Sequence, residues 1–322
     1  MRVVEAADID AALAFPALIE ALQQAFASDI SVPVRHHHTL ERPGMSSATH
    51  LLMPAWTNTG SEHFLGTKIV NVFPDNGKRG LPSISGTYLL MSGETGETLA
   101  AMDGARLTLW RTAAASALAA SFVTRADTGH LLMVGGGALA PFLIRAHASI
   151  RPLHRVTLWN RRLAVSQALA ANLADMALEI SIADTLETAV READLISCAT
   201  LSSEPLIKGR WLKPGSHLDL VGAYNPAMRE SDDECLRRAR IIVDTRAGAM
   251  KEAGDIVQPL ADGVIDRHDI IADLVELCRG TVAFTRQLED ITLFKSVGTA
   301  IEDLAAAMLV WQSLGKTGEA LG

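Results

Sequence analysis

A short apolar run that breaks into glycines and resumes with helical spacing, residues 130–144, constrains the fold of this chain most. Leu131–Val134 has the character of a buried strand, and Gly135, Gly137 and Ala140 follow it with the spacing G-x-G-x-x-A. Such glycines allow a tight turn, and the N-terminus of the following helix offers free N–H groups to an anion. The segment therefore predicts a strand, a phosphate-binding turn and a helix.

A second segment, Val156–Arg162, lies at about the distance where dinucleotide folds contact the ribose, roughly 20–25 residues downstream. Its strand-like run ends in Asn160, Arg161 and Arg162 rather than in an acid. An acid binds the 2′-hydroxyl of NAD and repels a 2′-phosphate, whereas arginines bind that phosphate. A glycine-rich turn before an exposed basic helix start would produce the same pattern. Together the two segments favour a dinucleotide site that prefers NADP(H), with NAD(H) as the alternative.

Bulk properties narrow the class of protein. A chain of 322 residues is long for one core, so two domains are expected. The net charge of −8 and the lack of a long basic run argue against nucleic-acid binding. The N-terminus carries acids where a signal peptide is cationic, and no apolar run is long enough for a membrane span. Three widely spaced cysteines suggest a reducing compartment, so a cytoplasmic location is expected.

Periodicity changes along the chain. Apolar residues from Ile9 to Phe26 have helical spacing and predict one amphipathic helix. Between residues 31 and 103, short β-prone runs alternate with Gly, Pro, Asn and Asp, which predicts an antiparallel β section. An alanine-rich helix is expected from Leu107 to Phe122, and a last apolar helix from Gly298 to Leu314.

After the glycine loop the pattern alternates between strand and helix. The expected strands are Leu131–Val134, Arg155–Trp159, Leu195–Cys198, His217–Val221 and Ile241–Asp244, with helices such as Leu163–Ala174 and Asp232–Arg238 between them. This alternation is typical of a doubly wound parallel sheet. The fold class is therefore α/β: a Rossmann-type domain over residues 116–299 and a smaller α+β domain over 1–115 and 300–322.

Three cations stand in largely apolar sequence in the first domain: Arg35, Lys68 and Arg111. Burying a cation is costly unless it meets an anion. For any one of them, a nearby carboxylate or solvent is a sufficient partner. As a set beside a nucleotide, they are equally consistent with a pocket for a small carboxylate.

Other chemistries have little support. His36, His37 and His38 are consecutive, and neighbouring side chains of an extended segment point to opposite faces, so no metal site is expected. No G-x-S-x-G nucleophile elbow occurs, which argues against a hydrolase.

Several segments, in order along nearly the whole chain, resemble the ornithine cyclodeaminase/mu-crystallin family. They are Gly66–Val72, Gly80–Thr87, Gly96–Gly104, Leu107–Ala114, Val221–Pro226, Glu252–Asp255 and Leu293–Leu304. The resemblance implies a homodimer built through the β-rich domain, which would also bind the substrate, and a separate nucleotide domain.

The resemblance also implies roles for individual residues. Arg35, Lys68 and Arg111 would hold the substrate carboxylate, with Ser83 nearby and Lys68 as the catalytic residue. The cofactor would contact residues from several segments: Thr112, Ala138, Leu139, Thr200, Val221 and Ser296. Gly135, Gly137, Asn160, Arg161 and Arg162 complete the expected cofactor site.

Two departures from the cyclodeaminase pattern narrow the expected activity. Cyclodeaminases of this family carry an aspartate after the Val-Gly-Gly segment, where this chain has Tyr224, and a glutamate before Leu-Met-Pro, where it has Leu51. Without these acids the chain lacks the groups that would bind or deprotonate a second amine. Asn160 and Arg161 after Trp159 resemble the NADPH-using reductase branch instead.

The expected function is NADPH-dependent reduction of a small cyclic ketimine carboxylate to the L-imino acid. The substrate would be Δ1-pyrroline-2-carboxylate, Δ1-piperideine-2-carboxylate or both, and the product proline or pipecolate. Alternatives are an alanine-type amino-acid dehydrogenase, an ornithine cyclodeaminase, or a non-enzymatic, mu-crystallin-like ligand-binding protein.

Overall fold

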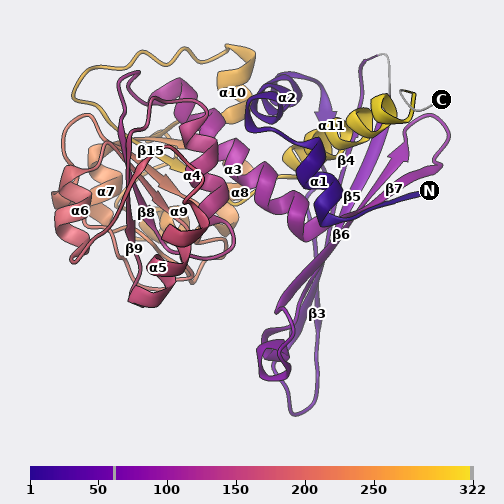
Figure 1. Ribbon diagram of the computed structural model, residues 1–322, viewed down its shortest axis with the longest axis horizontal. Helices are drawn as coiled ribbons and strands as arrows, with labels where there is room; N and C mark the ends of the chain where they lie inside the picture. The colour runs from indigo at the N-terminus through magenta and orange to yellow at the C-terminus, as the bar shows by residue number, and fades with distance from the viewer. Residues whose placement is uncertain (61–62, 320–322) are drawn as a thin grey trace. The chain divides into compact units, whose positions relative to one another are not determined.

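The computed structural model describes residues 1–60 and 63–319 and divides the chain into two compact units (Figure 1). Unit 1 comprises Met1–Arg111 with Thr299–Gly322, and unit 2 comprises Thr112–Gly298. The first boundary falls inside one helix, α3 (Gly104–Val123), whose residues are shared between the units. The sequence places the boundaries at 115/116 and 299/300.

Unit 1 is built on a sheet with the strand order β1-β7-β6-β5-β4-β2, in which β3 also pairs with β4. The strands are β1 (Arg2–Val4), β2 (Ile30–Ser31), β3 (His36–Leu40), β4 (Ala48–Thr57), β5 (Phe64–Val72), β6 (Ile84–Ser92) and β7 (Thr98–Asp103). Pairs among β2 to β7 are antiparallel, which confirms the predicted β section. The sequence patterns miss β1, which joins β7 in parallel, because three residues show too little alternation.

The helices of unit 1 are α1 (Ala6–Ala12), α2 (Phe15–Ala27) and α11 (Ala300–Glu319). Helix α11 packs against α2 and against strands β4, β5 and β6. The single helix predicted from Ile9 to Phe26 is wrong, because the chain is extended at Leu13 and Ala14. Pro16 lies in the first turn of α2, where its missing N–H costs no hydrogen bond, and a new helix starts there.

Strands β3 to β6 of unit 1 continue beyond its helices as an arm that ends near η1 (Pro74–Arg79) (Figure 1). Several large apolar side chains on or beside this arm are exposed: Val32, Val34, Leu40, Met45, Leu81 and Ile84. The arm therefore presents apolar surface in a single chain.

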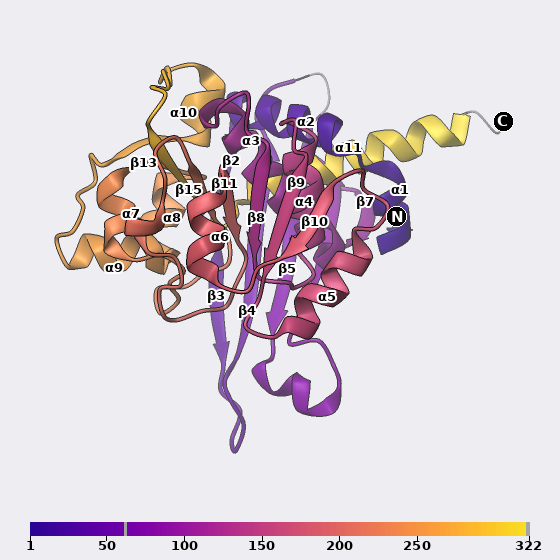
Figure 2. The same cartoon turned by 60° about the vertical axis from the view of Figure 1, so that its left-hand side comes forward.

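Unit 2 contains an eight-stranded parallel sheet of order β10-β9-β8-β11-β12-β15-β13-β14 (Figure 2). Its strands are β8 (His130–Val134), β9 (Arg155–Trp159), β10 (Glu179–Ile182), β11 (Leu195–Cys198), β12 (His217–Leu220), β13 (Ala239–Val243), β14 (Ile270–Asp273) and β15 (Ile291–Lys295). Its other helices are α4 (Ala140–Ala148), α5 (Leu163–Asn172), α6 (Leu186–Glu192), α7 (Asp233–Arg238), α8 (Arg246–Glu252), α9 (Gly254–Ala261) and α10 (Leu274–Arg279), with a short η2 (Gly209–Trp211). The predicted α/β, doubly wound fold class is confirmed.

The strand order of unit 2 reverses between β8 and β11. In open parallel sheets, ligands bind outside the carboxyl ends of the strands at such a reversal. The loops that follow β8 and β11 are therefore the expected ligand-binding loops of this unit.

Strand β15 is central to unit 2 yet is missed by the sequence patterns, as are β10 and β14. All five residues of β15 are buried, so the strand shows no alternation and is indistinguishable from the start of the next helix. It pairs with β12 and β13 and is an interior strand of the sheet.

Within residues 1–60 and 63–319, none of the helices combines the length and apolar character that a membrane crossing requires.

Candidate functional site

Lys68 lies at the centre of a buried charge cluster in unit 1. It occupies β5 between Met53 of β4 and Tyr88 of β6, and only 2% of it is exposed. Its Nζ lies 2.7 Å from Oδ2 of Asp303 on α11 and 3.4 Å from the Thr108 hydroxyl on α3. The alternation of β5 directs Lys68 to the face that α11 covers, where Asp303 meets it.

Burial is the main reason that the pKa of Lys68 falls to about 8, and the charge of Arg111 lowers it further, against the opposing effect of Asp303. Burial alone would raise the pKa of Asp303, but Lys68, Arg111 and Arg35 together hold it below its usual value. Asp303 is therefore a carboxylate, and Lys68 is an ammonium that can release its proton near neutral pH.

Arg111 is also buried and meets two carboxylates of α11. Its Nη1 lies 2.6 Å from Glu302 Oε2, and its Nε lies 2.9 Å from Asp303 Oδ1. Arg35, in the partly exposed segment before β3, is close enough to shift the pKa of both Lys68 and Asp303. The structure thus brings together the three predicted cations of unit 1.

Glu302 and Asp303 are site residues that the sequence patterns did not single out, although both lie in the family-like segment Leu293–Leu304. Both are fully buried. The available signal was two adjacent acids at the start of an otherwise apolar, alanine-rich helix. Such acids are expected to be paired when the helix is buried all round.

Tyr88 adds a buried polar group beside Lys68. Its hydroxyl has no hydrogen-bond partner within the part of the chain that the structure describes. A Cβ at Gly66 would lie 1.8 Å from that hydroxyl, so glycine is required there for the ring to pack over β5. Burial raises the pKa of Tyr88 well above its usual value, which keeps the phenol neutral.

Ser83 does not join this cluster. It precedes β6, and Val72 pairs with Ile84 four positions along β5 from the Lys68–Tyr88 pair. At about 3.4 Å per residue, Ser83 lies more than about 13 Å along the strand from Lys68. Its carbonyl accepts a hydrogen bond from Phe73 N, beside η1.

The glycine loop of unit 2 has the geometry of a tight turn at the end of β8. Gly135 has a φ of 109°, and a Cβ there would lie 2.5 Å from the Ala199 carbonyl oxygen. A Cβ at Gly137 would meet nothing within 4 Å, and this residue is exposed, as is Ala138. Leu139 is the N-cap residue of α4, so Gly137–Leu139 lead into a helix N-terminus.

Asn160, Arg161 and Arg162 follow β9, the neighbour of β8. The Arg162 backbone N–H donates to Asn160 Oδ1 at 3.0 Å, which shapes the turn before α5. Both arginine side chains are exposed. The structure therefore places them beyond the carboxyl end of the strand adjacent to the glycine loop.

Three of the other predicted cofactor residues also follow strands at their carboxyl ends. Thr200 follows β11, Val221 follows β12 and Ser296 follows β15. Ser296 is buried, and Asp244 Oδ2 accepts hydrogen bonds from its hydroxyl and from the N–H groups of Val297 and Gly298. Thr112 is the first residue of unit 2 and is buried in α3.

No group of three or more His, Cys, Asp or Glu suited to a metal ion occurs within residues 1–60 and 63–319. His36, His37 and His38 lie on the exposed strand β3. The residues that replace the cyclodeaminase acids are Leu51 in β4 and Tyr224, which is 40% exposed in the loop after β12.

A parallel sheet with a glycine turn at its strand-order reversal, joined to a second unit with a buried lysine–carboxylate cluster, defines a dinucleotide-binding type of α/β protein. The chain belongs to the ornithine cyclodeaminase/mu-crystallin family, whose model matches residues 2–318. The predicted family is thereby confirmed.

Individual relatives agree with this assignment. The Δ(1)-pyrroline-2-carboxylate reductase of Colwellia psychrerythraea is 35% identical over 318 residues, which are 98% of this chain and 99% of that protein. The ketimine reductase mu-crystallin of Rattus norvegicus is 34% identical over 81% of this chain and 79% of its own length. The solved structure of Thermococcus litoralis Δ(1)-pyrroline-2-carboxylate reductase with NADH and L-proline has a TM-score of 0.92 and 30% identity, covering 99% of this chain and 98% of that one.

Proposed function

We propose that this protein reduces a small cyclic ketimine carboxylate, Δ1-pyrroline-2-carboxylate or Δ1-piperideine-2-carboxylate, to the corresponding L-imino acid with NADPH. The chain is an oxidoreductase, as are the relatives named for imine reduction. The observation that carries the proposal is the buried ammonium of Lys68, held 2.7 Å from Asp303 among arginines.

The charges of the cluster suit a monoanionic substrate. Three cations (Arg35, Lys68 and Arg111) face two carboxylates (Glu302 and Asp303), so the five ionised side chains sum to one positive charge. A substrate carboxylate would neutralise that charge in a poorly solvated place, where ionic hydrogen bonds are strong. Arg111 is held rigidly by its two carboxylates and would orient the ring.

In this proposal Lys68 supplies the proton that the imine nitrogen gains during reduction. Because its pKa is about 8, it is mostly protonated at neutral pH and still a competent acid. Asp303 keeps the ammonium in place and stabilises its charged form. A bound nicotinamide supplies the hydride for the imine carbon.

Exposed arginines after β9 support NADPH over NADH. Arg161 and Arg162 lie where a dinucleotide fold contacts the ribose, and no acid stands there to repel a 2′-phosphate. NADH remains usable in this proposal, because the glycine turn after β8 recognises the phosphates common to both cofactors.

The absence of two acids favours reduction over deamination. A cyclodeaminase must manage a second, cationic amine, and Leu51 and Tyr224 offer no carboxylate for it. Leu51 has no hydrogen-bond acceptor, and the Tyr224 phenol does not supply the carboxylate that would balance an ammonium group.

The decisive experiment is an NAD(P)H-oxidation assay with pyrroline-2-carboxylate, piperideine-2-carboxylate, and pyruvate with ammonia. We expect turnover with a cyclic imine and faster turnover with NADPH than with NADH. Turnover only with pyruvate and ammonia would make the protein an amino-acid dehydrogenase, and NAD-dependent release of ammonia from ornithine would make it a cyclodeaminase. Ligand binding without any turnover would favour the non-enzymatic alternative.

We also propose that the protein is a cytoplasmic homodimer. The exposed apolar side chains of the β3–β6 arm support a second copy as their cover. All three cysteines are free thiols, which suits a reducing compartment.

A further inference from the structure

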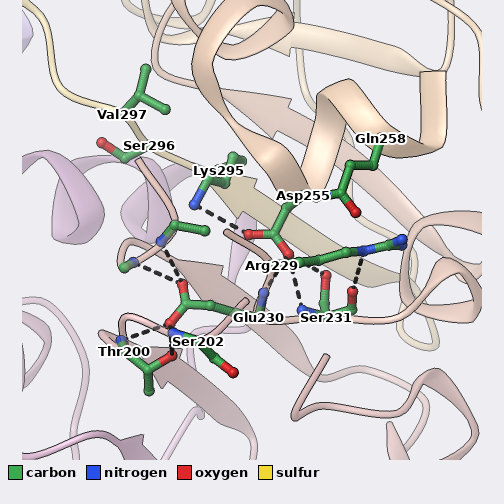
Figure 3. Close-up of polar contacts among 12 residues, drawn as sticks. Thr200, Ser202, Arg229, Glu230, Ser231, Asp255, Gln258, Lys295, Ser296 and Val297 are labelled. Carbon is green, nitrogen blue, oxygen red and sulfur yellow. Dashed lines mark hydrogen bonds and ion pairs between the residues drawn. The ribbon is translucent and has the colours of Figure 1, made fainter. Parts of the chain in front are cut away.

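Glu230, in the segment before α7, joins two loops of unit 2 through a fully buried carboxylate (Figure 3). Its Oε1 accepts hydrogen bonds from the Thr200 backbone N–H at 2.7 Å and from the Thr200 hydroxyl at 2.8 Å. Its Oε2 accepts from the N–H groups of Gly222 at 2.7 Å and Ala223 at 3.2 Å. One side chain thus satisfies four donors from the loops after β11 and β12.

These two loops are in direct contact. A Cβ at Gly222 would lie 2.0 Å from the Thr200 carbonyl oxygen and 2.6 Å from Glu230 Oε1. A Cβ at Gly135 would lie 3.3 Å from Thr200 Cγ2, so the Thr200 loop also borders the glycine turn. The loops therefore lie at the strand-order reversal, where a dinucleotide is expected to bind.

A second buried carboxylate fixes Glu230 itself. Asp255 Oδ1 accepts hydrogen bonds from the backbone N–H groups of Glu230 and Ser231 and from the Ser231 hydroxyl. Asp255 Oδ2 lies 3.4 Å from Nζ of Lys295, which is also fully buried (Figure 3). The arrangement is a chain of contacts from β15 through α9 to the two loops.

We propose that Glu230 is a positioning residue for the dinucleotide: its ionised carboxylate holds the Thr200 and Gly222–Ala223 loops in the conformation that receives the cofactor. The proposal rests on the proposed use of a nicotinamide cofactor. A protonated carboxyl or an amide accepts fewer hydrogen bonds than a carboxylate does. At least one of the four buried donors would then lose its partner. Loss of the charge therefore loosens both loops together.

The charged and titratable groups that face Glu230 are Lys295 from β15, Asp255 from α9 and the Cys198 thiol from β11. Burial raises the pKa of Glu230 to about 7, with Asp255 adding to the rise, while Lys295 and the Thr200 donors oppose it. Protonation near neutral pH then removes the ionised form that binds cofactor. NADH affinity should fall about tenfold between pH 8 and pH 6.

Stability and affinity should respond to this group in opposite directions. A carboxyl whose folded-state pKa is raised binds more protons in the folded state, so its contribution to stability decreases as pH rises from about 4.5 to 7. Acidification therefore favours the fold at Glu230 while it weakens cofactor binding. A residue with a purely structural role would not change cofactor affinity in the direction opposite to the stability of the fold.

The test is a fluorescence titration of NADH into the full-length protein between pH 6 and 8, together with urea unfolding. NADH is the probe because it lacks the 2′-phosphate, which titrates near pH 6. We expect Glu230→Gln to raise the dissociation constant of NADH about tenfold or more at pH 8 and to abolish the pH dependence. The matched control is Glu204→Gln, which changes an exposed acid in the segment after β11. This variant should have the wild-type dissociation constant for NADH.

Wild-type affinity for NADH in Glu230→Gln, with or without a lower urea midpoint, would overturn the inference. If Glu230→Gln does not fold, the wild-type titration decides: a dissociation constant that is the same at pH 6 and pH 8 refutes it. A wild-type protein that binds neither NADH nor NADPH would refute the proposed function itself, which is a distinguishable outcome.

Discussion

Lys68 owes its chemistry to a partner far away in the chain. Asp303 is 235 residues from it, yet the two side chains form a buried ion pair of 2.7 Å. Breaking such a pair leaves an uncompensated charge, which is strongly unfavourable in a buried place. The pair therefore keeps an ammonium group where burial alone would favour a neutral amine.

Lys68→Ala should lower imine reduction by at least about 10²-fold, because the proposed proton donor is lost. NADPH affinity should be nearly unchanged, since Lys68 belongs to unit 1 and the glycine turn to unit 2. The measurement is steady-state kinetics alongside an NADPH binding titration. Lys78→Ala removes an exposed lysine of the same unit and should have no effect, whereas unchanged kinetics in Lys68→Ala would contradict the proposed role.

The pH dependence of reduction should follow Lys68. Because its pKa is about 8, the ammonium loses its proton as pH rises above that value, and kcat/KM should decrease there. A pH profile of kcat/KM from 6 to 10 checks this. A profile that stays level up to pH 10 would exclude Lys68 as the acid.

Cofactor preference should depend on the arginines after β9. The double change Arg161→Ser with Arg162→Ser should raise KM for NADPH about tenfold or more and leave KM for NADH nearly unchanged. Arg191→Ser, an exposed arginine of α6 paired with Glu187, is the control. An equal loss with both cofactors would mean that these arginines do not recognise the 2′-phosphate.

At the scale of elements, two glycines of the turn between β8 and α4 have different roles, one in folding and the other in cofactor binding. Gly135 has a positive φ and abuts the Ala199 carbonyl, whereas the space beside Gly137 is open. The glycine spacing fits both a phosphate-binding turn and an ordinary glycine-rich turn. Only the structure distinguishes the role of Gly135 from that of Gly137.

Gly135→Ala should lower the free energy of unfolding by about 1–3 kcal/mol, because its backbone conformation and the close carbonyl both oppose a Cβ. Gly137→Ala should leave unfolding nearly unchanged but weaken NADPH binding, since the second glycine of this motif lets the backbone approach the pyrophosphate. Urea denaturation and NADPH titration of both variants check this. Equal effects of the two changes on stability would contradict it.

Elements whose ends are marked by loop residues were predictable, and those without such marks were not. Strands β9 and β11 have the predicted bounds, Arg155–Trp159 and Leu195–Cys198, because β-branched and apolar runs end at loop residues. The helix predicted across Leu13 failed because apolar spacing continues through a break that Pro16 imposes. Strand β15 was missed although β8, β11 and β12 are also fully buried, because its five residues lead with little interruption into the last apolar segment.

At the scale of the whole molecule, exposed apolar side chains gather on the β3–β6 arm, which supports self-association. Val34→Asp should shift the protein from dimer to monomer, because it places a charge on that apolar surface. Light scattering after size-exclusion chromatography measures the mass. Leu288→Asp alters an equally exposed residue of unit 2 and should leave the mass unchanged; a wild-type mass of one chain would refute the dimer.

Short segments of the sequence were enough to predict the glycine turn, the alternation of strands and helices, and the three isolated cations. Each of these features depends on residues that are close together in the chain. The partners of those cations were decided by tertiary structure alone. Asp303 reaches Lys68, and Glu230 reaches the loops after β11 and β12, only because packing brings distant segments together. A carboxylate's partner is determined by burial and distance, and neither quantity is encoded in its immediate neighbours.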